Sequence, residues 1–342
     1  MKNILDLEYS TLEERIHQLS EPSFRANQIW EGLYKQNYFC WNDFSNLPVS
    51  LRSYLAKEYN ILSLDLIKES KTIDKRTTKV LFRLNDGNQI ESVHLINNNR
   101  NTICISTQVG CPVGCAFCST GKNGFFRNLK ISEIISQVLF FSHRLHAIGQ
   151  NITNIVLMGM GEPFLNYNAT LQSIKRFNNS KGIDIGARRI TISTIGIVEK
   201  IIEFADEQRQ FNLAISLHAP NDKIREELIP IAHKYPIKEI LRSADYYISK
   251  TSRRITYEYV LIDKINSTRR HAQTLAELIR KQNCHVNLIA LNPNSHFKGE
   301  PPSVKKISDF ENILLNNGIS TTIRNSQGSK IKAGCGQLAG IK

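Results

Sequence analysis

Three closely spaced cysteines constrain this chain more than any other feature. Cys111, Cys115 and Cys118 lie in a C-x3-C-x2-C pattern, and no fourth cysteine lies beside them at metal-ligand spacing. A structural zinc site takes four ligands, whereas an iron–sulfur cluster held by three thiolates leaves one iron open to another ligand. The pattern therefore indicates a three-cysteine iron–sulfur site, a zinc site completed by a distant cysteine or histidine, or a chance cluster.

The residues around these cysteines suit a bulky inorganic group. Gly110 and Gly114 let the backbone wrap closely where side chains would clash. Phe117, just before the last cysteine, would give an apolar cover that limits solvent access.

After residue 98 the sequence alternates between strands and helices. Helices are expected near 132–145, 168–178, 197–206, 237–249 and 268–282, between apolar strands at 102–106, 154–158, 189–193, 211–217, 255–262 and 285–291. This alternation predicts an α/β fold with a parallel sheet, either doubly wound or a partial barrel. Because polar residues gather after the carboxyl ends of the strands, as in barrel active sites, we favour a partial (β/α)6 barrel.

Two further regions precede the barrel. Residues 1–60 have helical periodicity with prolines between the segments, and they predict a small helical N-terminal accessory domain. Its aromatic residues are expected in or near the core: Phe24, Trp30, Tyr34, Phe39 and Trp41. Residues 61–98 predict a β-hairpin extension, whose turn is Asp86-Gly87. Residues 99–342 would then form the barrel and a C-terminal loop that carries a cysteine.

Charge and cysteine usage limit the classes of function. The chain of 342 residues has a formal net charge of +13, and its basic residues recur in short groups, which modestly favours RNA or DNA as a partner. Seven cysteines, an odd number, do not suit a secreted disulfide framework. With neither a signal-peptide core nor an apolar run long enough to span a bilayer, the expected location is the cytoplasm, with no membrane partner.

Polar motifs follow four of the predicted strands. A glycine-rich turn, residues 159–163, contains Gly161 and Glu162, whose carboxylate could hold an ammonium group. The next strands end in Ser193 and in the run Ser216, Leu217 and His218, and a later strand ends at Asn292. Each motif alone also has an ordinary structural explanation, such as a loop, a turn cap or a satisfied histidine.

Three more residues stand out. Cys104 lies on the strand before the cysteine loop. Cys335 lies between glycines near the C-terminus, which suits a mobile nucleophile better than a packing residue. Glu91, on the second strand of the hairpin, alternates with apolar residues and would ordinarily be a solvated side chain.

The cysteine spacing with its aromatic residue resembles the cluster motif of the radical S-adenosylmethionine (radical SAM) superfamily. Nearly the whole chain resembles the bacterial RlmN family through an ordered set of motifs: 106–111 (STQVGC), 117–121 (FCSTG), 127–129 (RNL), 159–163 (GMGEP), 191–196 (TISTIG), 214–221 (AISLHAPN) and 335–340 (CGQLAG). The resemblance implies a radical SAM barrel and a methyltransferase that acts on carbon-2 of one adenosine in 23S rRNA, at the peptidyl transferase centre. Many members also act on a tRNA adenosine beside the anticodon.

The resemblance also implies the cofactors and their residues. A [4Fe-4S] cluster would be bound by Cys111, Cys115 and Cys118. S-adenosyl-L-methionine (SAM) would bind to the residues that follow the strand ends: Gly161, Glu162, Ser193, Ser216, Leu217, His218 and Asn292.

The implied reaction uses three side chains directly. Cys335 is methylated by one SAM molecule, and a 5'-deoxyadenosyl radical from a second SAM activates that methyl group for addition to the adenine. Cys104 releases the product through a disulfide with Cys335, and Glu91 accepts a proton. A radical route suits carbon-2, since this carbon is not nucleophilic, and the adenine must be exposed or flipped out of its stack.

One stretch departs from the family pattern. Related sequences usually carry an acidic residue and alanines before the terminal cysteine, whereas this chain has Lys330-Ile331-Lys332-Ala333-Gly334. The change leaves the cysteine in place, and it puts loop mobility and RNA preference in doubt.

Two other functions share part of this pattern. The Cfr-like branch methylates carbon-8 of the same adenosine, but Ser119 and Pro163 favour carbon-2. A non-catalytic RNA-binding protein with a zinc knuckle would need four metal ligands and neither Cys104 nor Cys335. The expected partners are 23S rRNA, tRNA and a reductant such as a flavodoxin.

Overall fold

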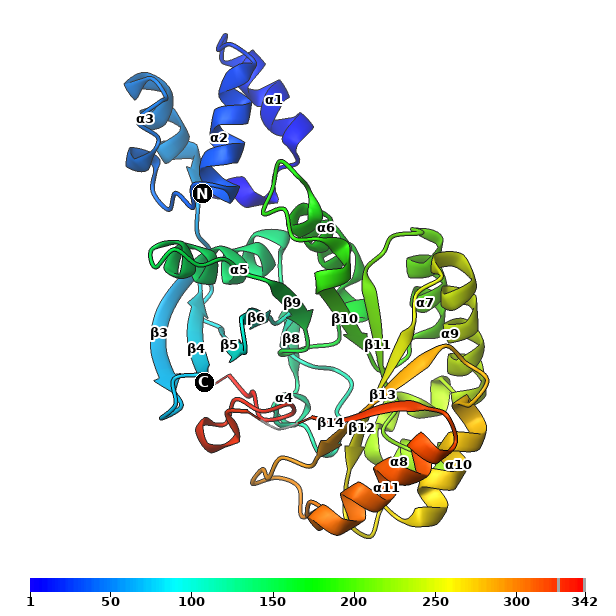
Figure 1. The fold of residues 1–342 in the computed structure, drawn as a ribbon. Helices are drawn as coiled ribbons and strands as arrows, with labels where there is room; N and C mark the ends of the chain where they lie inside the picture. Colours follow the sequence, from blue (N-terminus) through cyan, green and yellow to red (C-terminus); the bar gives the residue numbers. More distant parts are fainter. Residues whose placement is uncertain (325–326, 341–342) are drawn as a thin grey trace.

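The computed structural model describes residues 1–324 and 327–340, and within them the largest sheet has ten strands in the order β14-β13-β12-β11-β10-β9-β6-β5-β4-β3 (Figure 1). Every strand pair from β6 to β14 is parallel. The parallel strands are β6 (Arg100–Cys104), β9 (Asn154–Leu157), β10 (Ile190–Thr194), β11 (Asn212–Ser216), β12 (Ile255–Leu261), β13 (Cys284–Ala290) and β14 (Ser320–Arg324).

This architecture confirms the predicted partial barrel. All six predicted strands are present, and β14 adds a parallel strand that was not predicted. Its sequence, Ser320-Thr321-Thr322-Ile323-Arg324, is short and largely polar, and the strand is half exposed at the edge of the sheet. Such an edge strand lacks the continuous apolar run typical of a buried parallel strand.

Helices cover the outer face of the curved sheet (Figure 1). They are α5 (Ile131–His146), α6 (Tyr167–Asn178), α7 (Val198–Asp206), α8 (Asp222–Leu228), α9 (Ile237–Thr251), α10 (Arg269–Ile279) and α11 (Val304–Asn316). Strand residues alternate between the two faces. On β12, Tyr257 and Tyr259 are fully buried, whereas Glu258 and Val260 line a cavity at the mouth of the barrel.

The N-terminal segment folds as three helices, α1 (Tyr9–Gln18), α2 (Phe24–Tyr34) and α3 (Val49–Glu58), with a small pair of strands, β1 (Lys2–Asn3) and β2 (Tyr59–Asn60). Trp30 packs against Tyr9 and Tyr34 with ring centroids 5.4 and 4.7 Å apart, which confirms that these aromatics fill a core. Phe24 was also expected there, but it is 54% exposed because it opens α2 at the surface.

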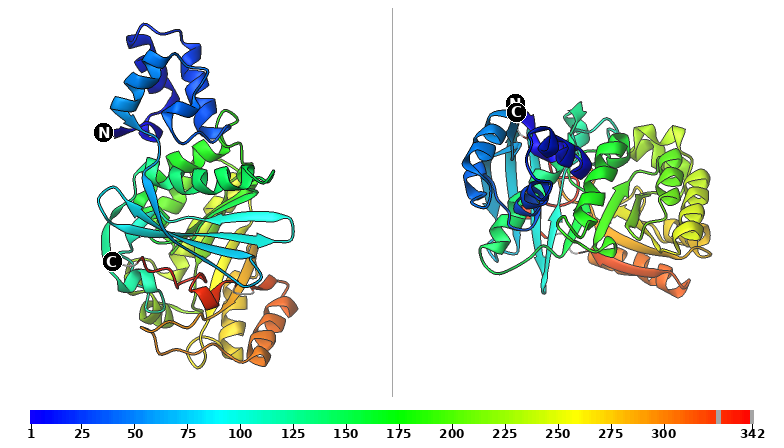
Figure 2. Two further views of the ribbon diagram at one scale, coloured as in Figure 1. Left: turned by 90° about the vertical axis from the view of Figure 1, so that its left-hand side faces the viewer. Right: turned by 90° about the horizontal axis from the view of Figure 1, so that it is seen from above.

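Residues 64–97 form an antiparallel meander of β3 (Leu64–Lys71), β4 (Thr77–Leu84) and β5 (Gln89–Asn97). The predicted hairpin corresponds to β4 and β5. Because β5 also pairs with β6, the meander continues the barrel sheet. In the left view of Figure 2 the C-terminal segment, in red, runs close to these strands. The boundaries given above for the three regions remain a prediction.

Two short strands, β7 (Gln108–Gly110) and β8 (Phe125–Asn128), and the short helix α4 (Ser119–Lys122) bracket the cysteine loop. In the described part of the chain, every helix is too short or too polar to cross a membrane.

Candidate functional site

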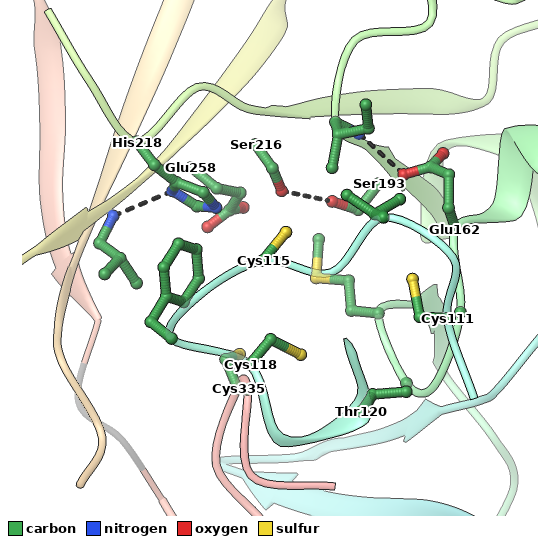
Figure 3. A pocket seen from close by; sticks show the side chains of 18 of the residues that line it. Cys111, Cys115, Cys118, Thr120, Glu162, Ser193, Ser216, His218, Glu258 and Cys335 are labelled. Atoms are coloured by element: carbon green, nitrogen blue, oxygen red, sulfur yellow. Dashed lines mark hydrogen bonds between the residues drawn. The ribbon is translucent and has the colours of Figure 1, made fainter. Parts of the chain in front are cut away.

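The cysteine loop begins where β7 ends and closes at the start of α4. Gly110 has φ +73°, and a Cβ atom there would lie 1.9 Å from the carbonyl oxygen of Gly124, so no larger residue fits. Cys111, Cys115 and Cys118 all line one cavity at the mouth of the barrel, which we call the cysteine cavity (Figure 3). The structure therefore brings together the three cysteines that the spacing singled out.

These thiols form a donor set that suits a cluster. Burial raises the pKa of the Cys111 thiol to about 12, although backbone hydrogen bonds from Val113 and Gly114 favour its thiolate. A coordinating metal deprotonates such a thiol outright. Among the described residues, no three histidine, cysteine or acidic side chains are arranged to hold a single metal ion. Three thiols that line one cavity match the donor set of an iron–sulfur cluster held by three cysteines.

Glu162 lies on another wall of the cavity, in the turn after β9. It is 3% exposed, and its oxygens accept hydrogen bonds from the backbone N–H groups of Phe164 (3.0 Å) and Ile195 (2.8 Å). Burial raises its pKa to about 7. Gly161 has φ +100°, and a Cβ atom there would lie 2.5 Å from Cβ of Gln108. The turn thus presents a fixed carboxylate whose charge a cationic ligand would stabilise.

Ser193, Ser216 and His218 come from the ends of β10 and β11 and line the same cavity (Figure 3). The two serine Oγ atoms are 3.4 Å apart. His218 accepts a hydrogen bond at Nδ1 from the N–H of Val260 (3.1 Å), and burial together with nearby Arg225 lowers its pKa to about 3. The ring is therefore neutral with its proton on Nε2, which makes it a hydrogen-bond donor.

Two predicted ligand residues lie behind the cavity wall. Leu217 is fully buried in the core. Asn292 donates from Nδ2 to the carbonyl oxygen of Cys335 at 3.0 Å. Neither lines the cysteine cavity, so in this structure Asn292 positions the C-terminal loop.

Hydrogen bonds hold the C-terminal loop in place. Thr120 donates to the carbonyl oxygen of Leu338 (2.6 Å), and Gln337 donates to that of Pro293 (3.0 Å). In this structure the neighbours of Cys335 are hydrogen-bonded to the barrel, and the mobility expected of this cysteine remains a prediction. Cys335 lines the cysteine cavity and also a second cavity beside it, which contains Cys104.

Cys104 and Cys335 share this second cavity with Arg324. Burial, and then the proximity of Cys335, raises the pKa of the Cys104 thiol to about 12, while the Arg324 guanidinium acts in the opposite direction. Both cysteines are free thiols. The structure thus places the two cysteines in a common space, as the resemblance implied.

Glu91 is buried, so the interpretation as a solvated strand residue is wrong. It is 3% exposed because β5 lies inside the sheet and the C-terminal loop covers it. Its Oε1 is 2.7 Å from Nζ of Lys79, and its Oε2 accepts a hydrogen bond from the N–H of Ala339 at 2.8 Å. Glu91 does not line the cysteine cavity.

Sequence reasoning missed two charged residues of the cavity, Glu258 and Arg324. Glu258 is 4% exposed, its Oε1 accepts a hydrogen bond from Nδ2 of Asn287 (2.9 Å), and its Oε2 is buried without a partner among the described residues. Burial raises its pKa, and Arg324 opposes that shift. The sequence did offer a signal for Glu258, because a carboxylate inside the otherwise apolar strand 255–262 is unusual. It offered none for Arg324, since this residue lies on β14, a strand that was not predicted.

Comparisons with known proteins agree with this geometry. The model of the radical SAM superfamily matches residues 105–278, and that of the ribosomal RNA large subunit methyltransferase N-terminal domain matches residues 2–61. A probable dual-specificity RNA methyltransferase RlmN of Dictyoglomus thermophilum is 44% identical over 100% of this chain and 97% of its own length. One from Protochlamydia amoebophila, RlmN 2, is 43% identical over 98% and 93%.

A solved structure extends the likeness to the whole fold. The crystal structure of a radical SAM methyltransferase from Sphaerobacter thermophilus covers 99% of each chain with a TM-score of 0.96 and 44% identity. Matches of this length and identity include both the N-terminal helices and the cysteine loop. The chain therefore belongs to the radical SAM superfamily and, within it, to the RlmN family.

Proposed function

We propose that this chain is a radical SAM methyltransferase that methylates carbon-2 of one adenosine in 23S rRNA, at the peptidyl transferase centre, and of a tRNA adenosine next to the anticodon. The observation that carries the proposal is the position of Cys335. The C-terminal loop holds it on the wall shared by the cysteine cavity and the cavity of Cys104. A cysteine in this position can carry a methyl group from a cofactor on one side to a substrate on the other.

The residues around the cysteine cavity suit the two cofactors of this family. Cys111, Cys115 and Cys118 would hold a [4Fe-4S] cluster. The Glu162 carboxylate would bind the ammonium group of SAM, beside the close backbone approach at Gly161. When bound, the cluster and SAM supply the methyl group and the one-electron chemistry of the reaction.

Polar groups farther along the strand ends would orient the rest of SAM. The Ser193 and Ser216 hydroxyls, the His218 Nε2 proton and the unpartnered Oε2 of Glu258 all belong to residues that line the cavity. Each can form a hydrogen bond with a polar atom of the nucleoside or the amino acid part of the cofactor. Leu217 and Asn292 would act from behind this wall, by packing and by holding the Cys335 loop.

Three residues would act on the substrate carbon. Cys335 carries the methyl carbon as a thioether and delivers it to the adenine. Cys104, in the same cavity, would form an S–S bond with Cys335 in place of the C–S bond that breaks. The released carbon would take up one proton, equivalent to the one that the Cys104 thiol loses, and so become the methyl group of the product. Glu91 would accept a proton, and its contact with Ala339 couples it to the same loop.

The proposal also concerns partners and location. A formal charge of +13 favours a polyanionic substrate such as RNA. The target adenine would be flipped out of its stack to reach the barrel mouth. We place the enzyme in the cytoplasm, with a reductant such as a flavodoxin that reduces the cluster.

Mass spectrometry of nucleosides tests the proposal. Anaerobically reconstituted protein is incubated with SAM, a reductant and either unmodified 23S rRNA or unmodified tRNA. We expect 2-methyladenosine in both RNAs. Product in only one RNA would remove the other from the substrates. Formation of 8-methyladenosine would instead favour the Cfr-like reaction, and absence of methylation with an intact cluster that cleaves SAM would contradict an RNA substrate of either kind.

A further inference from the structure

A separate basic cavity lies beside Glu91. Its volume is about 300 Å³, and it shares no residue with the lining of the cysteine cavity. Four lysines line it, and we call it the lysine cavity: Lys68, Lys79, Lys330 and Lys332, together with Ser70, Leu81, Glu91 and Ile331. Lys68 comes from β3 and Lys79 from β4, whereas Lys330 and Lys332 come from the C-terminal segment that starts with the short 3-10 helix η6 (Ser329–Ile331).

The charges in this cavity are not balanced. The Glu91 carboxylate pairs with Nζ of Lys79 at 2.7 Å. In the parts of the chain that the structure describes, Lys68, Lys330 and Lys332 form no ion pair, so three ammonium groups surround one space without a matching carboxylate. Like charges held together repel each other, and the arrangement becomes favourable when an anion enters.

Backbone hydrogen bonds hold the turn that carries Lys330 and Lys332 in place. Lys332 has φ +54°, a left-handed conformation that L-residues rarely adopt. Its N–H donates to the carbonyl oxygen of Ser329 (3.0 Å), and the N–H of Ala333 donates to that of Gly328 (2.9 Å). A tight turn thus presents Lys330 and Lys332 to the strands that carry Lys68 and Lys79.

The position of the cavity identifies the anion. Glu91 lines the cavity and also binds the backbone of Ala339, and Lys332 is only three residues before Cys335. An anion bound here would therefore be held by the segment that carries Cys335 and would lie beside the carboxylate proposed to accept a proton. Lysine ammonium groups bind phosphate as point charges, and a phosphate that lies beside a reacting nucleobase belongs to a nucleic acid backbone.

We propose that the lysine cavity binds a backbone phosphate of the RNA substrate, adjacent to the nucleotide that is methylated. The inference rests on the proposed function for the identity of the substrate. It goes further because it names the lysines that would fix the position of the RNA backbone relative to Cys335. Contacts to phosphate fix register and orientation without reading sequence, so the same site serves different RNAs that present one adenosine.

The salt dependence of RNA binding tests this proposal. Fluorescence anisotropy is measured with the cluster-reconstituted full chain and a labelled RNA hairpin that carries the target adenosine, from low to moderate potassium chloride. For Lys330→Gln/Lys332→Gln we expect about tenfold weaker binding at 100 mM salt and a log–log salt slope smaller in magnitude by about 1. Circular dichroism checks that the exposed substitutions leave the fold intact.

A matched control has the same change of charge elsewhere. Lys223→Gln/Lys238→Gln removes two exposed lysines from α8 and α9, and we expect an unchanged slope and affinity. A wild-type slope in Lys330→Gln/Lys332→Gln would show that these lysines contact no phosphate, and an equal loss in both double variants would show that only net charge matters. Either result would overturn the proposal.

A second arm distinguishes RNA from free anions. Thermal unfolding is followed with inorganic phosphate at millimolar concentration. If phosphate stabilises wild type but not Lys330→Gln/Lys332→Gln, while the two bind RNA equally, the cavity is a site for a free anion and the inference is wrong. A lysine-dependent salt slope in a protein that methylates no RNA would show that the lysine cavity binds RNA phosphate, but it would remove the proposed function and, with it, the position beside a methylated nucleotide.

Discussion

Residues of the C-terminal segment line both the cysteine cavity and the lysine cavity, but the two cavities are built in different ways. In the cysteine cavity, charged residues such as Glu162 and Glu258 are almost fully buried, and each has a defined backbone or side-chain partner. In the lysine cavity, Lys68, Lys330 and Lys332 are exposed and unpaired within the described residues. The first arrangement suits a small cofactor held in one pose, and the second suits a flexible polyanion.

The difference follows from the cost of desolvation. A buried charge must find its partners inside the protein, so strand ends and tight turns fix its position. An exposed lysine keeps its hydration and needs no partner until an anion arrives. Substitutions should therefore have large, specific effects in the cysteine cavity and small, salt-dependent effects in the lysine cavity.

The largest effect is expected for Cys335→Ala. Without this thiol no carbon is carried to the RNA, so methylation should fall by roughly a thousandfold or more, as for loss of a covalent nucleophile. Iron content and SAM cleavage should remain, because the cluster ligands are untouched. The measurements are nucleoside mass spectrometry and a SAM cleavage assay, with Cys40→Ala as a control at an exposed cysteine. Methylated RNA from Cys335→Ala would refute the proposed route.

Cys104→Ala should stop the reaction one step later. The methyl carbon would reach the RNA but stay attached to Cys335, so a covalent protein–RNA adduct accumulates instead of free product. Denaturing gel electrophoresis with labelled RNA detects it as a slowly migrating band. Ordinary turnover by this variant would remove Cys104 from the mechanism, and Cys284→Ala serves as the control at a buried cysteine on β13.

Glu258→Gln tests the residue that the sequence did not reveal. Its Oε2 has no partner among the described residues, and we expect it to accept a hydrogen bond from SAM. A hydrogen bond to a charged group contributes about 1.5–3 kcal/mol, so the affinity for SAM should fall about tenfold to a hundredfold. Equilibrium dialysis with reconstituted protein measures this change, with Glu226→Gln on α8 as an exposed control. Unchanged affinity would confine Glu258 to a structural role with Asn287.

The two cavities also differ in how far the sequence predicted them. The cysteine cavity was predictable for two reasons. Its three cysteines lie close together in the motif 111–118. Most of its polar residues follow the carboxyl ends of strands, and these ends meet at one edge of a parallel sheet. Glu162, Ser193 and Ser216 were found by this rule. Glu258 was missed because it lies within its strand rather than after it.

The lysine cavity could not be predicted in this way. Lys68, Lys79 and Lys332 are far apart in sequence, and they meet only because β3 and β4 continue the barrel sheet and the C-terminal loop returns to them. The burial of Glu91 has the same cause, since strand alternation does not reveal which loop will cover a strand. Long-range contacts of this kind need the three-dimensional arrangement.

Glu162 should make stability depend on pH. Below pH 4.5 its carboxyl is protonated in both the folded and the unfolded chain. Between pH 4.5 and its raised pKa of about 7 only the unfolded chain loses the proton, so the free energy of unfolding decreases as pH rises, and it levels off above pH 7. For the cluster-free protein, Glu162→Gln should remove this loss, which amounts to roughly 3 kcal/mol at most.

Urea unfolding at pH 5 and pH 8 measures the effect. We expect the stability of Glu162→Gln relative to wild type to increase from pH 5 to pH 8, while Glu226→Gln shows no such change. A constant difference between Glu162→Gln and wild type at both pH values would mean that Glu162 ionises with an ordinary pKa despite its burial.

The smallest effect is expected in the lysine cavity, and its sign is opposite to that of most substitutions. Removing two of the mutually repelling ammonium groups in Lys330→Gln/Lys332→Gln should raise the thermal unfolding midpoint by about one degree at low salt, since exposed charge interactions contribute well below 1 kcal/mol. The gain should vanish at about 0.3 M salt, where screening removes the repulsion. Lys223→Gln/Lys238→Gln should show no comparable gain. If Lys330→Gln/Lys332→Gln were no more stable than wild type at low salt, the lysines would not be held close together in solution, and the contrast between a buried cofactor cavity and a charged RNA cavity would lose its electrostatic basis.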